Sequence, residues 1–442
     1  MQTLEEVLQE GNEHVVKGRT IEALRCFEAA LRIKPGYWYT SYIYGTLLAQ
    51  MGEDGAAMVF LHHSLQLNAE NPEGLYNMAN CMRRQGHRNS AAIIYDQALK
   101  LKPDPHVLAG LAGCYVNDGR PDKALEYADE GLKIDPDNES CAHHKAIALL
   151  EKGDFSEGFK WYENRKRIPE WTKRVYEYPQ WTGEKVKTLL IHGEQGIGDE
   201  ILYMGWLPKI AGKYERLVVE CTPRIVKTFT RSFGTCYATD KEVIANEKGI
   251  DAVVAMGSLP FIAGGLPPHG AYLKADPERV QHYRNRLRAL GPGPYIGLSW
   301  HGGVVKTHAH FRTTQAGLWK RFTDYGTTIS IQYGAYGRDA GSLGIPHWQE
   351  AIDDLDELVA LISALDLVVT VNNTNVHMCG ALDVPCWTLT PSKPAWRYQL
   401  EGETIPWYGS VRQFRQQGDD WSSAFASVET ALGDWLRERK AA

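Results

Sequence analysis

The sequence predicts a helical repeat array followed by an α/β region whose two halves each contain a parallel sheet. Three observations lead to this fold class. A period of about 34 residues fills the first third of the 442-residue chain, short apolar strands alternate with amphipathic helices from Thr188 onward, and polar loops at 192–200 and 372–377 each follow a buried strand. Alternating strands and helices are typical of parallel sheets with right-handed crossovers. The length of the chain also implies two or three domains.

The repeat is marked by glycines whose positions differ by 34, 34, 33 and 34 residues: Gly18, Gly52, Gly86, Gly119 and Gly153. Five residues after each of the first four comes an alanine, and three units end on a proline: Ala23, Ala57, Ala91 and Ala124, with Pro35, Pro103 and Pro136. The alanine lets two helices pack closely, the glycine lies at the turn between them, and the proline ends the second helix. This pattern resembles the tetratricopeptide repeat, with four full units and a partial fifth within residues 1–165. Such units stack into a superhelix because one helix pair cannot bury its apolar face alone.

Composition excludes several classes of protein. Hydrophobic residues make up 43% and charged residues 23% of the chain, which is ordinary for a soluble globular protein, and the net charge of −6 gives no support to a nucleic-acid binder. The start of the chain lacks a secretory signal, and no run approaches the about 18 apolar residues of a membrane span. The 8 cysteines are scattered without a Cys-x-x-Cys, so we expect reduced thiols, a cytoplasmic location and no metal. The pairs at 62–63 and 143–144 are histidines that lack metal-ligand spacing.

Residues 166–187 show no periodicity and contain Pro169 and Pro179, so we interpret them as a connector. We expect two Rossmann-like domains after it, at 188–291 and 292–442, which face each other across a cleft. The predicted strands are 189–191, 217–220, 251–255, 295–300, 328–332, 367–371 and 385–389, and the predicted helices are 199–214, 224–233, 277–290, 355–364, 376–382 and a final one at 420–439.

The two polar loops lie where ligands bind in open α/β sheets, because backbone N–H groups and helix dipoles point outward at the carboxyl ends of the strands. One half of the α/β region could therefore hold a nucleotide diphosphate, and the other half an acceptor.

Seven motifs that follow one another along the chain together resemble those of a known family. They are 193–199 (Gly-Glu-Gln-Gly-Ile-Gly-Asp), 258–260, 297–303, 331–333, 373–377 followed by 380–382, 391–398, and 407–408 with 414–416. Together they resemble bacterial and phage proteins that join tetratricopeptide repeats to a GT-B glycosyltransferase domain. That domain is similar to the lipopolysaccharide heptosyltransferases, and the layout is similar to the O-linked N-acetylglucosamine transferases. The resemblance covers essentially the whole chain, with two departures: Asn372 stands where relatives often carry Asp, and Asp383 replaces a common Gly.

The resemblance implies an enzyme that moves a sugar from a nucleotide-sugar to an acceptor hydroxyl independently of metal. It favours inversion over retention, a choice that the sequence itself does not determine. It places the acceptor in the first half and the nucleotide-sugar in the second. Asp199 is the candidate general base, and the alternative is that it caps a helix. His192 and Glu194 are the reserve bases in the same acceptor-side loop, where Gly196 and Gly198 serve backbone conformation and close approach.

The donor side is predicted from polar and basic groups after the later strands. Asn373, Thr374 and Asn375 offer donors at a helix start, and His377 lies in its first turn. The alternatives are simple capping and a packed core histidine. The resemblance implies that a Lys or Arg of the loop after 295–300 reaches the leaving diphosphate, for which Lys306 and Arg312 are the candidates, and the alternative is a solvated surface loop. Lys393 and Arg397 follow the strand that ends near Leu389, where they could add charge near the phosphates, and Trp396 could pack on the base or ribose unless it belongs to the core.

Two other functions stay open. The chain could be a non-catalytic binding scaffold with a degenerate enzyme fold, or a transferase that acts on hydroxymethylated phage DNA. For the transferase, the acceptor is a protein or a glycan more readily than a nucleic acid, and the sequence determines neither the base nor the sugar of the donor. The repeats either bind the acceptor or a partner protein in a concave groove, or support self-association and the catalytic domain. An aromatic cluster at 37–44 packs between units or lines that groove.

Overall fold

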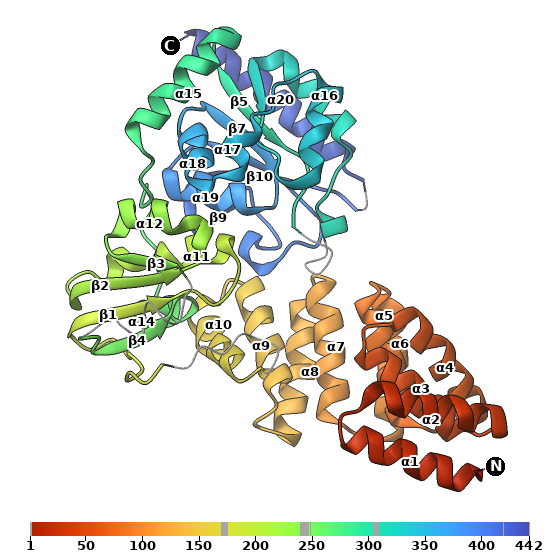
Figure 1. Cartoon of the computed structure of the whole chain (residues 1–442). Helices are drawn as coiled ribbons and strands as arrows, with labels where there is room; N and C mark the ends of the chain where they lie inside the picture. Colours follow the sequence, from red (N-terminus) through yellow and green to blue (C-terminus); the bar gives the residue numbers. More distant parts are fainter. Residues whose placement is uncertain are drawn as a thin grey trace. The chain divides into compact units, whose positions relative to one another are not determined.

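The computed structural model describes residues 2–168, 176–238, 247, 249–303, 309–418 and 420–441, without the side chains of His310 and Ala441. The chain forms two compact units, Met1–Lys152 and Gly153–Ala442 (Figure 1). The break falls between the two helices of the last predicted repeat.

The first unit consists of antiparallel helix pairs, as the repeat predicts. Its helices are α1 (Leu4–Val16), α2 (Thr20–Ile33), α3 (Trp38–Gln50), α4 (Asp54–Leu67), α5 (Pro72–Arg84), α6 (Arg88–Leu101), α7 (Pro105–Asn117), α8 (Pro121–Ile134) and α9 (Glu139–Glu151). The repeat alanines Ala23, Ala57, Ala91 and Ala124 are fully buried. Gly52 in one of the turns has φ of 83°, a left-handed conformation that glycine adopts without strain. The predicted superhelix of helical repeats is therefore confirmed.

The second unit opens with α10 (Phe155–Tyr162) and the short helix η1 (Glu163–Arg167), followed by a parallel sheet in the order β3-β2-β1-β4. Its strands are β1 (Val186–His192), β2 (Tyr214–Cys221), β3 (Cys236–Ala238) and β4 (Ala252–Ala255). Helices of this half include α11 (Ile197–Met204), η2 (Leu207–Ile210), α12 (Val226–Phe233), α14 (Leu259–Ala263) and α15 (Pro277–Leu290).

The second sheet has the order β6-β5-β7-β8-β10-β9, parallel except for β9. Its strands are β5 (Tyr295–Ser299), β6 (Thr327–Ser330), β7 (Leu367–Val371), β8 (Cys386–Thr390), β9 (Thr404–Ile405) and β10 (Tyr408–Arg415). Helices of this half include η6 (Ala309–Phe311), η7 (Ala316–Tyr325), α16 (Ala340–Leu343), α17 (Gln349–Asp353), α18 (Leu355–Ser363), α19 (Thr374–Leu382), η9 (Trp396–Tyr398) and α20 (Ser422–Ala441). The alternating strand–helix prediction of two parallel sheets is confirmed.

Each sheet contains a point at which the direction of strand succession reverses. In the first sheet this point lies between β1 and β4, and in the second it lies between β5 and β7. Ligands of open α/β sheets bind outside the carboxyl ends of strands at such points. The loops after β1 and β7 are the two polar loops of the sequence, so the topology places both where a ligand is expected.

Buried polar contacts join the two halves of the second unit. Asp356 on α18 is 1% exposed and accepts hydrogen bonds from Thr228 (2.7 Å) and Arg231 (2.7 and 2.8 Å) on α12. Helix α11 also packs directly on α19. These contacts bring the N-terminal ends of α11 and α19 into one region.

The structure corrects some of the predicted elements. The helix expected at 199–214 is wrong in its second half, because α11 ends at Met204 before Gly205, and Pro208 lies in the separate turn of η2. Strands β3, β9 and β10 were not predicted, since they lack a continuous apolar run. The described part of the connector contacts the first sheet, where the Trp181 N–H donates to the Val253 carbonyl at 2.8 Å.

Candidate functional site

A cavity of about 580 Å³ lies between the two halves of the second unit, at the carboxyl ends of their strands. This volume is in the range of small-molecule sites. Its wall includes 196–199 after β1, 373–375 with His377 after β7, Arg397 and Tyr398 after β8, and Arg224, Arg312 and Tyr333. Of the predicted residues, the structure therefore brings together Gly196, Gly198, Asp199, Arg312, Asn373, Thr374, Asn375, His377 and Arg397.

Asp199 lies in the first turn of α11, but it does not cap that helix. The N-cap is Gly196, which offers no side-chain acceptor. Asp199 instead forms an ion pair with Arg397, and its side chain is 22% exposed. The alternative that Asp199 caps the helix is thus wrong, and Asp199 lines the cavity.

Gly198 allows the two helix ends to meet. A Cβ atom there would lie 3.2 Å from Cδ2 of His377 and 3.6 Å from Oγ1 of Thr374. The N-terminal ends of α11 and α19 consequently meet at one wall of the cavity. Both ends carry partial positive charge from the helix dipole and unpaired backbone N–H groups.

Arg397 is the main cation of the cavity wall. Burial opposes the charged form of its guanidinium, but Asp199 outweighs burial and raises the pKa of Arg397 above its usual range. The guanidinium also lies 4.7 Å from the ring centroid of Trp396 and donates to Oε1 of Gln195 at 3.4 Å. Arg397 is therefore charged and held at the cavity by contacts from both halves.

Asn373 caps α19 and ties it to the neighbouring strand. Its Oδ1 accepts from the Asn375 N–H at 2.9 Å, and its Nδ2 donates to Oγ of Ser299 at 3.0 Å. Asn375 is 1% exposed, and its Oδ1 has no hydrogen-bond partner among the described residues. The capping alternative thus holds for Asn373, while Asn375 offers an unused buried acceptor at the cavity.

His377 is neutral. Burial, together with the positive charges of Arg397 and Arg312, lowers the pKa of its imidazole to about 3. Its Nδ1 lies 3.1 Å from the Tyr408 hydroxyl. A site in which two guanidinium groups act on one imidazole has a positive potential, and a bound anion would be stabilised there.

Arg312 reaches the wall from the loop after β5. Its Nε donates to the Gly302 carbonyl at 3.2 Å, and the adjacent Gly303 N–H donates to the Tyr333 hydroxyl at 2.9 Å. The second predicted cation of this loop, Lys306, lies outside the described residues.

Four predicted residues do not line the cavity. The ring of His192 is 8% exposed and lies 5.1 Å from that of Tyr176. Lys393 is exposed. Trp396 is 3% exposed and packs in an aromatic cluster with Phe159 (5.8 Å) and Trp407 (5.7 Å), which matches the core alternative stated for it.

Glu194, the fourth of these, is held by Arg165, a residue that sequence reasoning missed. Arg165 is fully buried and its Nη2 donates to Glu194 Oε1 at 2.6 Å, while the Gly257 N–H donates to the same oxygen at 2.9 Å. Burial lowers the pKa of the Arg165 guanidinium, but the carboxylates of Glu194 and Glu163 outweigh burial and raise it. Nothing in the basic stretch 165–167 marks Arg165 as the buried member, so no sequence signal was available.

The amide oxygen of Asn372 is satisfied by its surroundings, whereas its Nδ2 is buried without a hydrogen-bond partner among the described residues. Its Oδ1 accepts from the hydroxyls of Thr388 (2.8 Å) and Thr390 (3.1 Å), and the residue is 2% exposed. Asn372 therefore stabilises the turn between β7 and α19, and it does not line the cavity.

Comparison with known proteins agrees with the helical repeats. A family model for the tetratricopeptide repeat matches residues 76–139. The chain is 28% identical over 454 aligned positions to the protein FlbA of Caulobacter vibrioides (strain ATCC 19089 / CIP 103742 / CB 15), and the match covers 94% of this chain and 70% of FlbA.

Among solved structures, the crystal structure of MamA is similar with a TM-score of 0.33 and 21% identity over 35% of this chain and 91% of MamA. Pseudomonas aeruginosa pilF is similar with a TM-score of 0.33 and 20% identity over 36% of this chain and 74% of pilF.

These findings define the chain as a protein with tetratricopeptide repeats, similar to FlbA, whose repeats are followed by an α/β region with parallel sheets. Among the described helices, none has both the length and the apolar character needed to cross a bilayer.

Proposed function

We propose that the second unit is a GT-B glycosyltransferase, which transfers a sugar from a nucleotide-sugar to an acceptor hydroxyl. The observation that carries the proposal is the pairing of Asp199 with Arg397 in a cavity where two helix N-termini meet. A carboxylate for the acceptor and a cationic wall for the donor then lie within one site. The resemblance of seven ordered motifs to such enzymes supports the same function.

The cavity wall suits a diphosphate. Among the described residues, the charged side chains of the wall are three arginines, Arg224, Arg312 and Arg397, and one carboxylate, Asp199. Helix N-termini and guanidinium groups are the protein groups that bind phosphate oxygens best. The same groups stabilise the charge that develops on the diphosphate when it leaves.

The proposed reaction is a displacement at the anomeric carbon of the donor. The acceptor oxygen forms a bond to that carbon, the bond between the carbon and the diphosphate oxygen breaks, and the nucleoside diphosphate leaves with the electron pair. The carboxylate of Asp199 takes the proton of the acceptor hydroxyl. Attack opposite the leaving group inverts the configuration of the sugar.

The ion pair also requires the donor to bind before Asp199 can act as a base. Without donor, Arg397 neutralises the Asp199 carboxylate that must accept a proton. A diphosphate in the cavity competes for the same guanidinium, because it carries more charge than one carboxylate. Donor binding would then free Asp199 to act as a base, and Asp199 would be unproductive before the donor arrives.

The repeats supply a further element of the proposal. Tetratricopeptide repeats form extended surfaces for protein segments. We assign the first unit the binding of the acceptor, or of a partner that brings it, and we favour a protein acceptor for this reason.

The test is a thermal-shift screen of the full chain with UDP, GDP, ADP, CMP and dTDP, without added metal. One nucleotide should raise the melting temperature, since a ligand at about 100 times its Kd stabilises the folded state by about 2.7 kcal/mol. The shift should vanish in Arg397→Met. It should persist in Arg412→Met, which removes an exposed arginine of β10 outside the cavity wall. Absence of any shift, or an equal shift in both variants, would refute the donor site.

A further inference from the structure

The first repeat differs from the next three at three positions of its helix-pair interface. These positions are Glu10 and His14 on α1 and Cys26 on α2. Adding the repeat period gives the matching residues of the following units: Tyr44, Leu48 and Phe60, then Met78, Met82 and Ile94, then Leu111, Tyr115 and Tyr127. All nine are apolar or aromatic, whereas the first repeat carries a carboxylate, an imidazole and a thiol.

The matching residues pack the two helices of a repeat together. The rings of Tyr44 and Phe60 lie 4.6 Å apart between centroids, and those of Tyr115 and Tyr127 stack at 5.4 Å. The first repeat has no such ring pair at these positions, because its residues are polar. Another interaction between α1 and α2 is therefore expected there.

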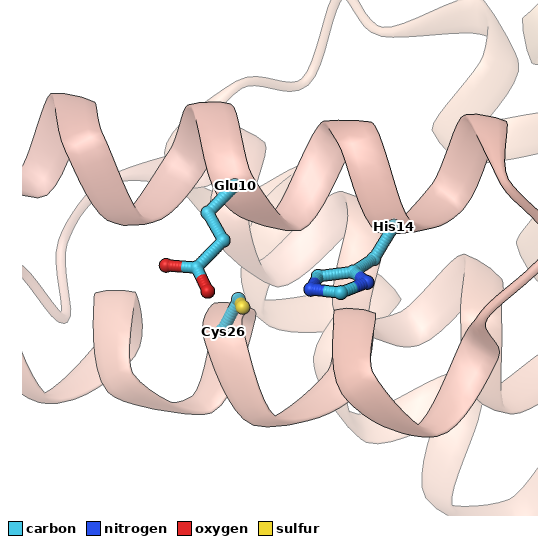
Figure 2. A group of neighbouring side chains, drawn as sticks. All are labelled: Glu10, His14 and Cys26. Carbon is cyan, nitrogen blue, oxygen red and sulfur yellow. The ribbon is translucent and has the colours of Figure 1, made fainter.

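The three side chains of the first repeat converge. Glu10 and His14 are one helical turn apart, and Cys26 faces them from α2 (Figure 2). Their ligand atoms all lie within 4.8 Å of one another. Gly11 makes this possible, since a Cβ there would lie 3.1 Å from both Cβ of Cys26 and the ring of Phe27.

The imidazole is not satisfied by the protein. Nδ1 of His14 is buried and has no hydrogen-bond partner among the described residues. The other ring nitrogen, Nε2, is the one turned toward Cys26 and Glu10, so it is the candidate ligand atom (Figure 2). Glu10 accepts from Nε2 of Gln2 through Oε2 at 3.0 Å.

We propose that Glu10, His14 and Cys26 bind a divalent transition-metal ion, of which Zn²⁺ fits best. A set of thiolate, imidazole and carboxylate ligands suits zinc and disfavours Mg²⁺ and Ca²⁺, which select oxygen. Zinc bond lengths of about 2.0 to 2.3 Å bring ligand atoms to roughly 3.5 Å from one another. Side-chain rotation shortens the observed separations of up to 4.8 Å between the ligand atoms to this distance, because Glu10 is exposed and His14 and Cys26 are half-buried.

The ion would join α1 to α2 where the other repeats use apolar contacts. Because the site needs both helices in place, metal binding stabilises the folded repeat over the unfolded chain. Three protein ligands leave a fourth position for water or a further group. This inference is independent of the function proposed for the second unit.

The test is a titration of the full chain with Co²⁺ after treatment with a chelator. Wild type should bind one Co²⁺ and show the near-ultraviolet charge-transfer band of a cobalt–thiolate bond. The band should be lost in Glu10→Tyr/His14→Leu/Cys26→Phe, which carries the residues of the second repeat at these positions. Cys236→Ser, which changes the other half-buried thiol, should keep the band.

Cys26→Ser is a second variant that keeps the size of the side chain, and circular dichroism checks that each variant is helical. Zn²⁺ should raise the melting temperature of wild type and leave that of Cys26→Ser unchanged. Absence of a stoichiometric cobalt band in wild type, or a band that survives in the folded triple variant, would overturn the proposal.

Discussion

Arg165 anchors the loop that carries Asp199, and its removal should destabilise the second unit strongly. It is 0% exposed and joins three segments of the chain. Its guanidinium donates to Glu194 (2.6 Å), to Glu163 (2.8 Å) and to the Ser258 hydroxyl (3.1 Å). Glu194 lies directly before the segment 195–199, so the contact positions that loop.

The perturbation is Arg165→Met, which keeps much of the side-chain volume and removes the charge. It leaves the carboxylate of Glu194, whose side chain is 10% exposed, with the Gly257 N–H as its remaining donor among the described residues. Removing one partner of a buried ion pair costs about 3 to 5 kcal/mol, because the other charge stays buried. Arg165→Met/Glu194→Gln removes that charge as well, and should recover about 2 kcal/mol of the loss.

The assay is urea unfolding followed by tryptophan fluorescence. Of the 13 tryptophans only Trp38 lies before residue 153, so the signal reports on the second unit. Lys166→Met is the matched control, because Lys166 is 40% exposed and pairs with the same Glu163. An exposed pair contributes about 0 to 1 kcal/mol.

A loss below about 1 kcal/mol in Arg165→Met, close to that of Lys166→Met, would refute the buried-charge argument. So would a double variant no more stable than the single one, since the cost would then come from lost packing and not from the unpaired carboxylate.

Three further predictions concern the cavity and the contact between the halves. Asp199→Asn should keep the thermal shift with the nucleotide that binds and lower hydrolysis of the corresponding nucleotide-sugar by about 100-fold or more; unchanged hydrolysis would remove Asp199 as the base. The pKa of His377 is about 3 in the folded chain, below the about 6.5 of an unfolded histidine, so only the unfolded state gains this proton as the pH falls from 6.5. Between pH 6 and 5, the free energy of unfolding of wild type, measured with urea, should therefore fall by about 1.4 kcal/mol per pH unit more than that of His377→Gln. An equal dependence of this free energy on pH in both proteins would contradict the low pKa of His377. Asp356→Asn should destabilise the second unit by about 3 kcal/mol, against about 1 kcal/mol for Thr228→Val, because it leaves Arg231 without its buried carboxylate.

The sequence by itself determined the helical repeats and most of the sheet strands. A repeat period and runs of apolar residues are local properties, and strands such as β7 were predicted at the observed bounds. The position of the polar loops followed from the same patterns, since a loop after a buried parallel strand reaches the carboxyl edge of the sheet. The resemblance of the ordered motifs to those of glycosyltransferases then led to the hypothesis about the reaction.

Only the tertiary structure decided how the charges pair. Asp199 and Arg397 are 198 positions apart, and Arg165 meets Glu194 across 29 positions, so neither contact leaves a periodic signal. The structure also placed the Trp396 ring in the core and assigned Glu194 to a buried ion pair. Burial and pairing depend on which surfaces meet after folding, and that is the physical reason why residue type and spacing predicted the loops but not the partners of their side chains.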